Sequence, residues 1–284
     1  MPKNLYINNG KVGNVYWNGA KAKKVYFNNV LVFSGAFEFT YTGAYEVEGD
    51  LGGNFIIRFK TSGTLTVTDK GDASAIDVFC LGGGGAGCYY DADGYGGAGG
   101  GGGYTKTIKN LSISVGTKIT VTVGAGGVVV NSTTPVKGGT SSILTCEATG
   151  GYGGAKAFIG CDGGSGGGGA IENTNSGYSG GWDGKGGNGV YLGGKGQGTT
   201  TTEFGEASGT LYAGGGGGGS LYINVDGSSG GIGGGGAGAK QSTTTGIAGV
   251  ANQGGGGGGN RSNLSYTYQK GVGGSGIVCI RNHR

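Results

Sequence analysis

The first residues of the chain repeat a short pattern of apolar and polar positions every ten residues. Each repeat has an apolar or aromatic triplet, then Asn-Asn or Asn-Gly, then a second short run, as at 4–12, 14–22 and 24–32. Asn-Gly accepts positive backbone φ angles and closes tight hairpins. The pattern therefore predicts three small β-hairpins within residues 1–34.

Hairpins this short cannot bury a core of their own, so they need each other or a partner. We therefore interpret residues 1–34 as an attachment module and expect the chain to form homo-oligomers. The candidate assembly contacts are the aromatic residues that recur in the repeats: Tyr6, Tyr16, Trp17, Tyr26 and Phe27.

From residue 37 to residue 123 the pattern changes to alternating or continuously apolar runs rich in β-branched residues, which is typical of β-strands. No amphipathic helix is evident, so the predicted fold class is all-β, with a β-sandwich-like domain over residues 35–146. A closing strand at 276–281 resembles the run at 76–81, and we expect these two strands to be neighbours in one sheet. The strands predicted from the pattern before residue 124 are 55–59, 64–68, 75–81, 105–109, 111–115 and 118–123.

Glycine dominates the rest of the pattern, with 79 Gly among 284 residues. Ordering a glycine costs roughly 0.5–1 kcal/mol more than ordering an alanine. Ordered runs therefore indicate backbones that approach more closely than a Cβ allows. We interpret residues 147–284 as a glycine-rich domain containing a bundle of polyglycine II helices, extended and with three residues per turn. The alternative is a set of long loops on a β-sandwich. The runs are 82–85, 99–103, 166–169, 214–219, 233–236 and 254–259.

Charge and cysteine content exclude several classes of protein. The net charge is only +4 and charged residues make up 13%, which argues against a nucleic-acid partner. No apolar stretch reaches the roughly 18 residues needed to insert in a membrane, and the opening residues lack the apolar region of a signal peptide. The five cysteines show no Cys-x-x-Cys spacing. We expect buried, reduced thiols in a chain synthesised in a cytoplasm.

Candidate catalytic chemistry is sparse. The single histidine, His283, is next to the end of the sequence, where a solvated side chain is expected. Asp91-Ala-Asp93-Gly94 begins like an EF-hand loop, but Gly102 stands where the essential Glu would be. A looser Ca²⁺ site using Asp72 or Asp162 stays open. We expect no enzyme activity, no cofactor and no metal.

Aromatic residues between the glycine runs are the better indication of function. Tyr and Trp offer large contact areas at low entropic cost, which suits recognition surfaces. Trp182 stands alone in a polar, glycine-rich loop. The alternative is that these rings cover the glycine bundle as its core. The predicted receptor-binding residues are Trp182, Tyr178, Tyr191, Asp183 and Asn175.

Four ordered motifs resemble the glycine-rich domain of many bacteriophage tail proteins. They are Ile76–Gly85, the run 99–103 followed by Tyr104-Thr-Lys, Val121–Gly127 and Gly273–Arg281, and the similarity extends over roughly residues 65–284. The N-terminal repeat also resembles short modules of such proteins. The resemblance implies a virion part, often a distal adhesin or fibre, without a catalytic site.

The leading hypothesis is a structural virion protein of a phage tail, in a fibre or tail tip that binds a host receptor. Its expected partners are other tail proteins and a glycan or protein on the bacterial surface. One alternative is an ice-binding protein of polyglycine helices, with hydroxyl faces at Thr199–Thr202 and Thr243–Thr245. Another is a purely structural virion decoration protein without receptor contact. A glycan depolymerase would need a carboxylate pair in a cleft.

Overall fold

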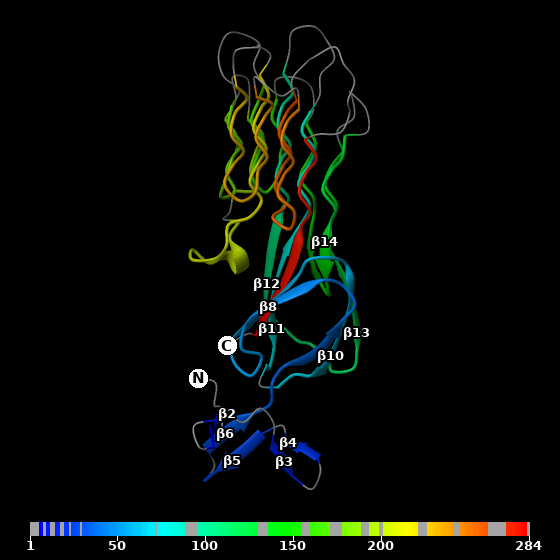
Figure 1. Ribbon diagram of the computed structural model, residues 1–284, viewed down its shortest axis with the longest axis vertical. Coiled ribbons are helices and arrows are strands. Elements are labelled where there is room, and N and C mark those ends of the chain that lie inside the picture. The colour runs from blue at the N-terminus through cyan, green and yellow to red at the C-terminus, as the bar shows by residue number, and fades with distance from the viewer. Residues whose placement is uncertain are drawn as a thin grey trace. The chain divides into compact units, whose positions relative to one another are not determined.

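The chain is described by a computed structural model (Figure 1), in which strands and extended segments predominate. The structure describes residues 6–7, 10–11, 15–17, 20–22, 24–28, 30–71, 73–88, 96–129, 136–154, 159–170, 178–188, 193–198, 201–220, 226–240, 245–260 and 271–282.

Three antiparallel hairpins open the chain, as the ten-residue repeat predicts. In the first two, the recurring tyrosine faces a lysine across the hairpin, in the pairs Tyr6–Lys11 and Tyr16–Lys21. A register shift after Val25 changes the third, where Tyr26 faces Leu31. The paired strands are β1 (Tyr6–Ile7) with β2 (Gly10–Lys11), β3 (Val15–Trp17) with β4 (Ala20–Ala22), and β5 (Lys24–Phe27) with β6 (Val30–Ser34).

Two five-stranded antiparallel sheets follow, which confirms the all-β fold class. Among the described residues the one helical element is a short 3-10 turn, η1 (Glu203–Gly205). The first sheet has the order β15 (Cys146–Ala148), β14 (Ser141–Ile143), β13 (Lys118–Thr122), β10 (Gly63–Asp69), β7 (Glu38–Tyr41). The second has the order β12 (Thr105–Leu111), β11 (Ile76–Leu81), β16 (Ile277–Asn282), β9 (Phe55–Phe59), β8 (Tyr45–Gly49).

The second sheet confirms one long-range prediction and corrects a local one. Strands β11 and β16 are neighbours, as their similar sequences indicate. The separate strand predicted at 111–115 is wrong, because β12 runs through to Leu111 and the chain then turns. Asn110 adopts a left-handed φ of 59° and its N–H donates to Asp77 Oδ1 at 3.0 Å. This local bend ends the pairing although the alternating pattern continues.

The chain forms two compact units that are interleaved in sequence. The first consists of residues 1–78, 108–121 and 279–284. Aromatic rings from both sheets meet in its core: Tyr41 of β7 lies 4.5 Å from Phe59 of β9, between ring centroids. The sheets therefore face each other as a sandwich in this unit. The boundaries predicted at 34/35 and 146/147 stay a prediction.

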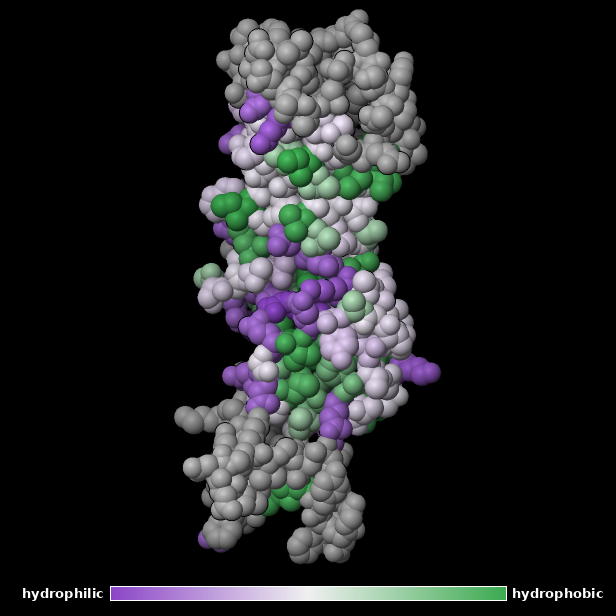
Figure 2. Space-filling model, viewed as in Figure 1, coloured by the Kyte–Doolittle hydropathy of each residue, from purple (hydrophilic) through white to green (hydrophobic). Residues whose placement is uncertain are grey.

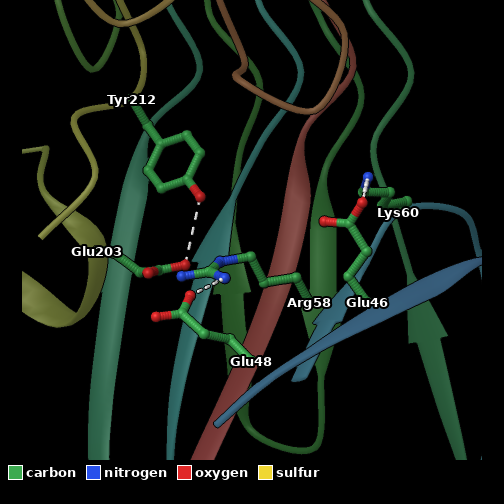
Figure 3. A network of polar contacts seen from close by, with 6 residues as sticks. All are labelled: Glu46, Glu48, Arg58, Lys60, Glu203 and Tyr212. Atoms are coloured by element: carbon green, nitrogen blue, oxygen red, sulfur yellow. Dashed lines mark hydrogen bonds and ion pairs between the residues drawn. The ribbon is translucent and has the colours of Figure 1, made fainter. Parts of the chain in front are cut away.

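Strand β8 lies at an exposed edge of its sheet and carries charged residues. Figure 3 shows two ion pairs, one between Glu48 and Arg58 and one between Glu46 and Lys60. Arg58 Nη1 lies 2.6 Å from Glu48 Oε2. Exposed pairs of this kind contribute at most about 1 kcal/mol each. Charges on an edge strand also discourage pairing with foreign strands.

The second unit, residues 79–107 and 122–278, is built from the glycine-rich segments, which run side by side as wavy extended ribbons in Figure 1. Hydrogen bonds from residues 82–88 change partner with a period of three. Gly82, Gly85 and Cys88 donate to carbonyls of the segment 98–104, and the residues between them donate alternately to two other segments. A helix with three residues per turn directs its amides in this way. The polyglycine II conformation itself stays a prediction.

Segment 82–88 therefore has neighbours on all its sides. Its amides donate to three segments and its carbonyls accept from three more. The amides of segment 82–88 donate to residues in 98–104, 136–139 and 271–274. Its carbonyls accept from residue 127 and from residues in 151–154 and 257–260. Segment 214–219 shows the same pattern, with Gly216 donating to Gly100 and Gly219 to Gly97. Segments 82–88 and 214–219 are thus interior segments of a bundle and not loops on its surface.

Close backbone approach explains why glycine is required in these runs. A Cβ built on Gly216 would overlap the carbonyl oxygen of Gly257, and one on Gly256 would overlap that of Gly100. Neither residue has a positive φ, so the requirement is for space and not for a left-handed backbone. The obstructing atoms belong to backbone, which cannot move aside as a flexible side chain can.

Gly216→Ala and Gly256→Ala should therefore each lower the free energy of unfolding by about 3 kcal/mol or more, because one methyl group forces two backbones apart. Gly52→Ala is the matched control, since its Cβ would meet only Asp50 Oδ1, at an ordinary 3.5 Å. Chemical denaturation of the three variants measures the difference. Equal stabilities would mean that the runs are loosely packed.

Candidate functional site

Exposed apolar residues on the glycine-rich unit are dispersed. On the face seen in Figure 2, small hydrophobic areas are separated by pale surface. Single exposed apolar residues are normal and do not by themselves mark a binding site. A candidate site must therefore rest on local geometry. The large apolar residues exposed on this unit are Val128, Leu144, Tyr152, Ile159, Trp182, Ile232, Ile247 and Val250.

Trp182 occupies the first position of a tight turn. The Lys185 N–H donates to the Trp182 carbonyl at 3.1 Å, and the two residues between them have φ angles of 52° (Asp183) and 70° (Gly184). Positive φ at both central positions defines a type I′ turn, for which Asp-Gly is a favoured pair. The turn is fixed to the bundle, since the Gly184 N–H donates to Ser165 Oγ at 3.2 Å.

The Trp182 ring is 45% exposed, and Lys185 extends over it. The Lys185 Nζ lies 4.9 Å from the ring centroid, within the range of a cation–π contact. An exposed site makes this contact worth about 0.5–1 kcal/mol. The turn thus presents a flat ring and a positive charge together on a rigid base, which suits recognition of a polar, partly apolar ligand.

Asp183 carries two features that cost stability. Its φ lies in the left-handed region, which a side chain with a Cβ adopts at a cost of about 1 kcal/mol. Its Oδ1 atom is buried and has no hydrogen-bond partner among the residues that the structure describes. Unpaired buried acceptors and strained backbone gather at functional sites. The left-handed backbone suits the type I′ turn, so the unpaired Oδ1 is the feature of Asp183 that stability does not explain.

Of the other predicted contacts, Asp183 lies in the same turn as Trp182, whereas Tyr178 does not. Tyr178 is half-buried at the far end of the extended segment 178–182. Four residues at about 3.1 Å rise place it about 12 Å from Trp182. Tyr191 and Asn175 lie outside the described residues. The site that the structure supports is therefore the turn 182–185, which the tyrosine does not join.

The predicted assembly contacts lie on the hairpins. Tyr6, Tyr16, Trp17, Tyr26 and Phe27 are all in strands β1, β3 and β5. The structure gives their backbone pairing, and their role in assembly stays a prediction.

Two acidic residues of the glycine-rich unit, Glu203 and Asp162, are hydrogen-bonded to neighbouring groups of the chain. Glu203 is buried and accepts a hydrogen bond from the Tyr212 hydroxyl at 3.2 Å, drawn in Figure 3. The Tyr212 ring lies against Phe79, with centroids 5.5 Å apart. Asp162 Oδ1 accepts from the Lys195 N–H at 2.6 Å. These carboxylates serve the packing of the unit.

Within the described ranges, no group of three His, Cys, Asp or Glu side chains is arranged to hold a metal ion. Asp72, Asp91, Asp93 and His283 lie outside those ranges. Among the residues that the structure describes, no helix has the length and apolar character to cross a bilayer.

Sequence reasoning found Trp182 but missed Lys185 and Ser165. The signal for Lys185 was present, because Asp-Gly marks a two-residue turn and places the flanking residues side by side. A second pair of this kind also went unnoticed: Lys137 Nζ lies 4.5 Å from the ring centroid of Tyr152, which is 50% exposed. No local pattern connects residues so far apart in sequence.

Asp183→Gly should raise the free energy of unfolding by about 1 kcal/mol, because it removes the buried unpaired oxygen and relieves the left-handed backbone. Asn252→Gly is the matched control. Asn252 has a similar φ of 58°, but its Nδ2 donates to the Gly276 carbonyl at 3.0 Å, so its loss should destabilise. Urea denaturation compares the two. A destabilised Asp183→Gly would show that Asp183 is a structural residue.

The sequence was compared with protein families and with curated proteins. No curated protein matches this chain. A family model described as a glycine-rich domain matches residues 60–283. The match begins before β10 and ends after β16, so it covers most of both sheets and the whole glycine bundle. The chain therefore belongs to the glycine-rich domain family.

Proposed function

We propose that this chain is a structural component of a bacteriophage tail, in a fibre or tail tip, and that it contacts the host cell. The observation that carries the proposal is the glycine bundle, whose interior segments are each hydrogen-bonded to several neighbours. Such a bundle provides a stiff base and contributes few side chains for catalysis. The four motifs that resemble phage tail proteins lie within the region that the family model matches.

The turn 182–185 is the proposed receptor contact. An aromatic ring covers the apolar face of a sugar, and the nearby Lys185 supplies a donor for hydroxyl or acidic groups of a surface glycan. A protein receptor would use the same ring as an interface anchor. The strained Asp183 supports a role in recognition, because the turn keeps it at a cost in stability.

Ice binding is less well supported. Thr201 is fully buried and Thr202 nearly so, so neither can contribute to a flat hydroxyl face. Residues 199–200 and 243–244 lie outside the described ranges. The alternative is a decoration protein without receptor contact, for which the same bundle would provide the stiff base.

Immunogold electron microscopy tests the proposal directly. Antibody raised against the purified chain should label one end of the tail of particles from the producing strain, and Fab fragments should block adsorption. Labelling without blocking would favour the decoration protein. Absence of the chain from purified particles would overturn the proposal.

Trp182→Ala should weaken binding of the purified chain to host cells by about 1–3 kcal/mol, which is about 5- to 150-fold in Kd, if the ring is an interface anchor. The stability should change by less than about 1 kcal/mol, because the ring is exposed. Tyr152→Ala removes a similarly exposed ring next to a lysine and serves as the control. Adsorption and thermal midpoint are measured on each variant. If Trp182→Ala and Tyr152→Ala lost adsorption equally, Trp182 would not be a specific receptor contact.

Deletion of residues 1–34 tests the attachment role. The three hairpins are separate two-stranded sheets, and such units are marginally stable alone. The shortened chain should stay folded, with the thermal midpoint of the sandwich and bundle retained, but should no longer join particles. Incorporation of the shortened chain into particles at the normal level would contradict the attachment role.

A further inference from the structure

Four of the five cysteines form two neighbouring pairs within the glycine-rich unit. The Cys80 thiol donates to the Cys146 carbonyl at 3.6 Å, and the Cys146 thiol donates to the Lys106 carbonyl at 3.6 Å. The two cysteines are close enough for Cys80 to affect the pKa of Cys146. Cys88 and Cys161 are close enough for each charge to affect the other. All four are buried, and none of them is in a disulfide. The function proposed above uses none of these thiols.

The first pair connects two different sheets. Cys80 lies on β11, the second strand of one sheet, and Cys146 begins β15, at the edge of the other. These two strands belong to different sheets, so no hydrogen bonds of a common sheet connect them. A bond between the two sulfurs would link them. It would be a covalent cross-link between sheets within one chain.

Cys146 is fully buried but lies in a short hairpin at the edge of its sheet. It follows an exposed turn in which Leu144 has a φ of 52° and is 44% exposed. The hairpin β14–β15 has only three residues in each strand and lies at the sheet edge. Short edge hairpins open locally at low free-energy cost. Brief opening would expose the Cys146 sulfur while the rest of the unit stays folded.

We propose that Cys80 and Cys146 are an oxidative modification site, at which a small peroxide converts the thiol pair into an intersheet disulfide. The Cys146 thiolate attacks one peroxide oxygen, the O–O bond breaks, and Cys146 becomes a sulfenic acid as water forms. The Cys80 sulfur then attacks the Cys146 sulfur, the S–O bond breaks, and the hydroxyl leaves as water with the Cys80 proton. In total two thiols and one hydrogen peroxide give one disulfide and two waters.

The environments of the two pairs favour reaction at the first. The hydrogen bond from Cys80, with a smaller contribution from the Lys106 charge, lowers the pKa of Cys146 against the opposing effect of burial. The thiolate is the reactive form. Burial, together with the neighbouring Cys161, raises the pKa of Cys88 to about 12. The Cys161 thiol donates to the Gly153 carbonyl at 2.8 Å, a shorter contact than the 3.6 Å from the Cys146 thiol to the Lys106 carbonyl. The second pair should therefore stay reduced and serves as an internal control.

The test treats the purified full chain with hydrogen peroxide at a few molar equivalents. We expect the loss of two titratable thiols, a linked Cys80–Cys146 peptide in a non-reducing digest, and a chain that stays monomeric on a denaturing gel. Because the cross-link restricts the unfolded chain, the thermal midpoint should rise by about 5 °C or more and return after reduction with dithiothreitol.

Variants separate this site from the other thiols. Cys146→Ser and Cys80→Ser should abolish both the linked peptide and the rise in thermal midpoint, whereas Cys88→Ser should retain both. Peptide mapping of the unmodified chain decides the question even if the variants fold poorly. A Cys88–Cys161 link, an intermolecular link, or sulfinic acid at Cys146 without any link would each overturn the proposal.

Discussion

The glycine-rich unit depends on one interaction: the sideways hydrogen bond between extended backbones that have no side chains between them. A backbone that forms no bonds to itself must satisfy every buried amide and carbonyl through its neighbours. In segment 82–88 the amides and carbonyls form hydrogen bonds with six different segments. This is possible only while the backbones stay so close that a Cβ would overlap a neighbouring carbonyl. The high glycine content is thus a packing requirement, and the bundle has a core made of main chain.

The sandwich and the bundle illustrate two kinds of core that adjoin along the sequence. Strands 55–59 and 76–81 follow the familiar rule that apolar side chains are buried, with rings such as Phe37 and Phe55 in contact at 4.8 Å. At Gly82 the rule changes, because buried positions now carry no side chain. Strand β11 continues directly into the bundle segment 82–88. A single stretch of chain therefore belongs first to a core of side chains and then to a core of peptide groups.

The sequence predicted the local elements better than their partners. The ten-residue repeat predicted the three hairpins, and the similarity of 76–81 to 276–281 predicted that they are adjacent. The extra strand at 111–115 was wrong, because Asn110 bends the backbone where the alternating pattern gives no warning. The glycine runs carry no pattern that distinguishes one neighbour from another, so the six partners of segment 82–88 could not be inferred. For the candidate site, the sequence analysis selected Trp182 but overlooked the turn that Asp-Gly marks, and the buried unpaired oxygen of Asp183 follows only from the tertiary structure.

The mixed origin of those six partners has a consequence for how the chain reaches its native state. Segment 82–88 bonds to residues near 100 and to residues near 274 alike. During synthesis, some of its amides therefore have no hydrogen-bond acceptor until almost the whole polypeptide has left the ribosome. Contacts between distant residues close slowly, since the entropy of a long loop is lost before they form. The unit should consequently assemble late and in few steps. Once complete, it should open only when many bonds break together, so that its lifetime is set by a slow unfolding rate.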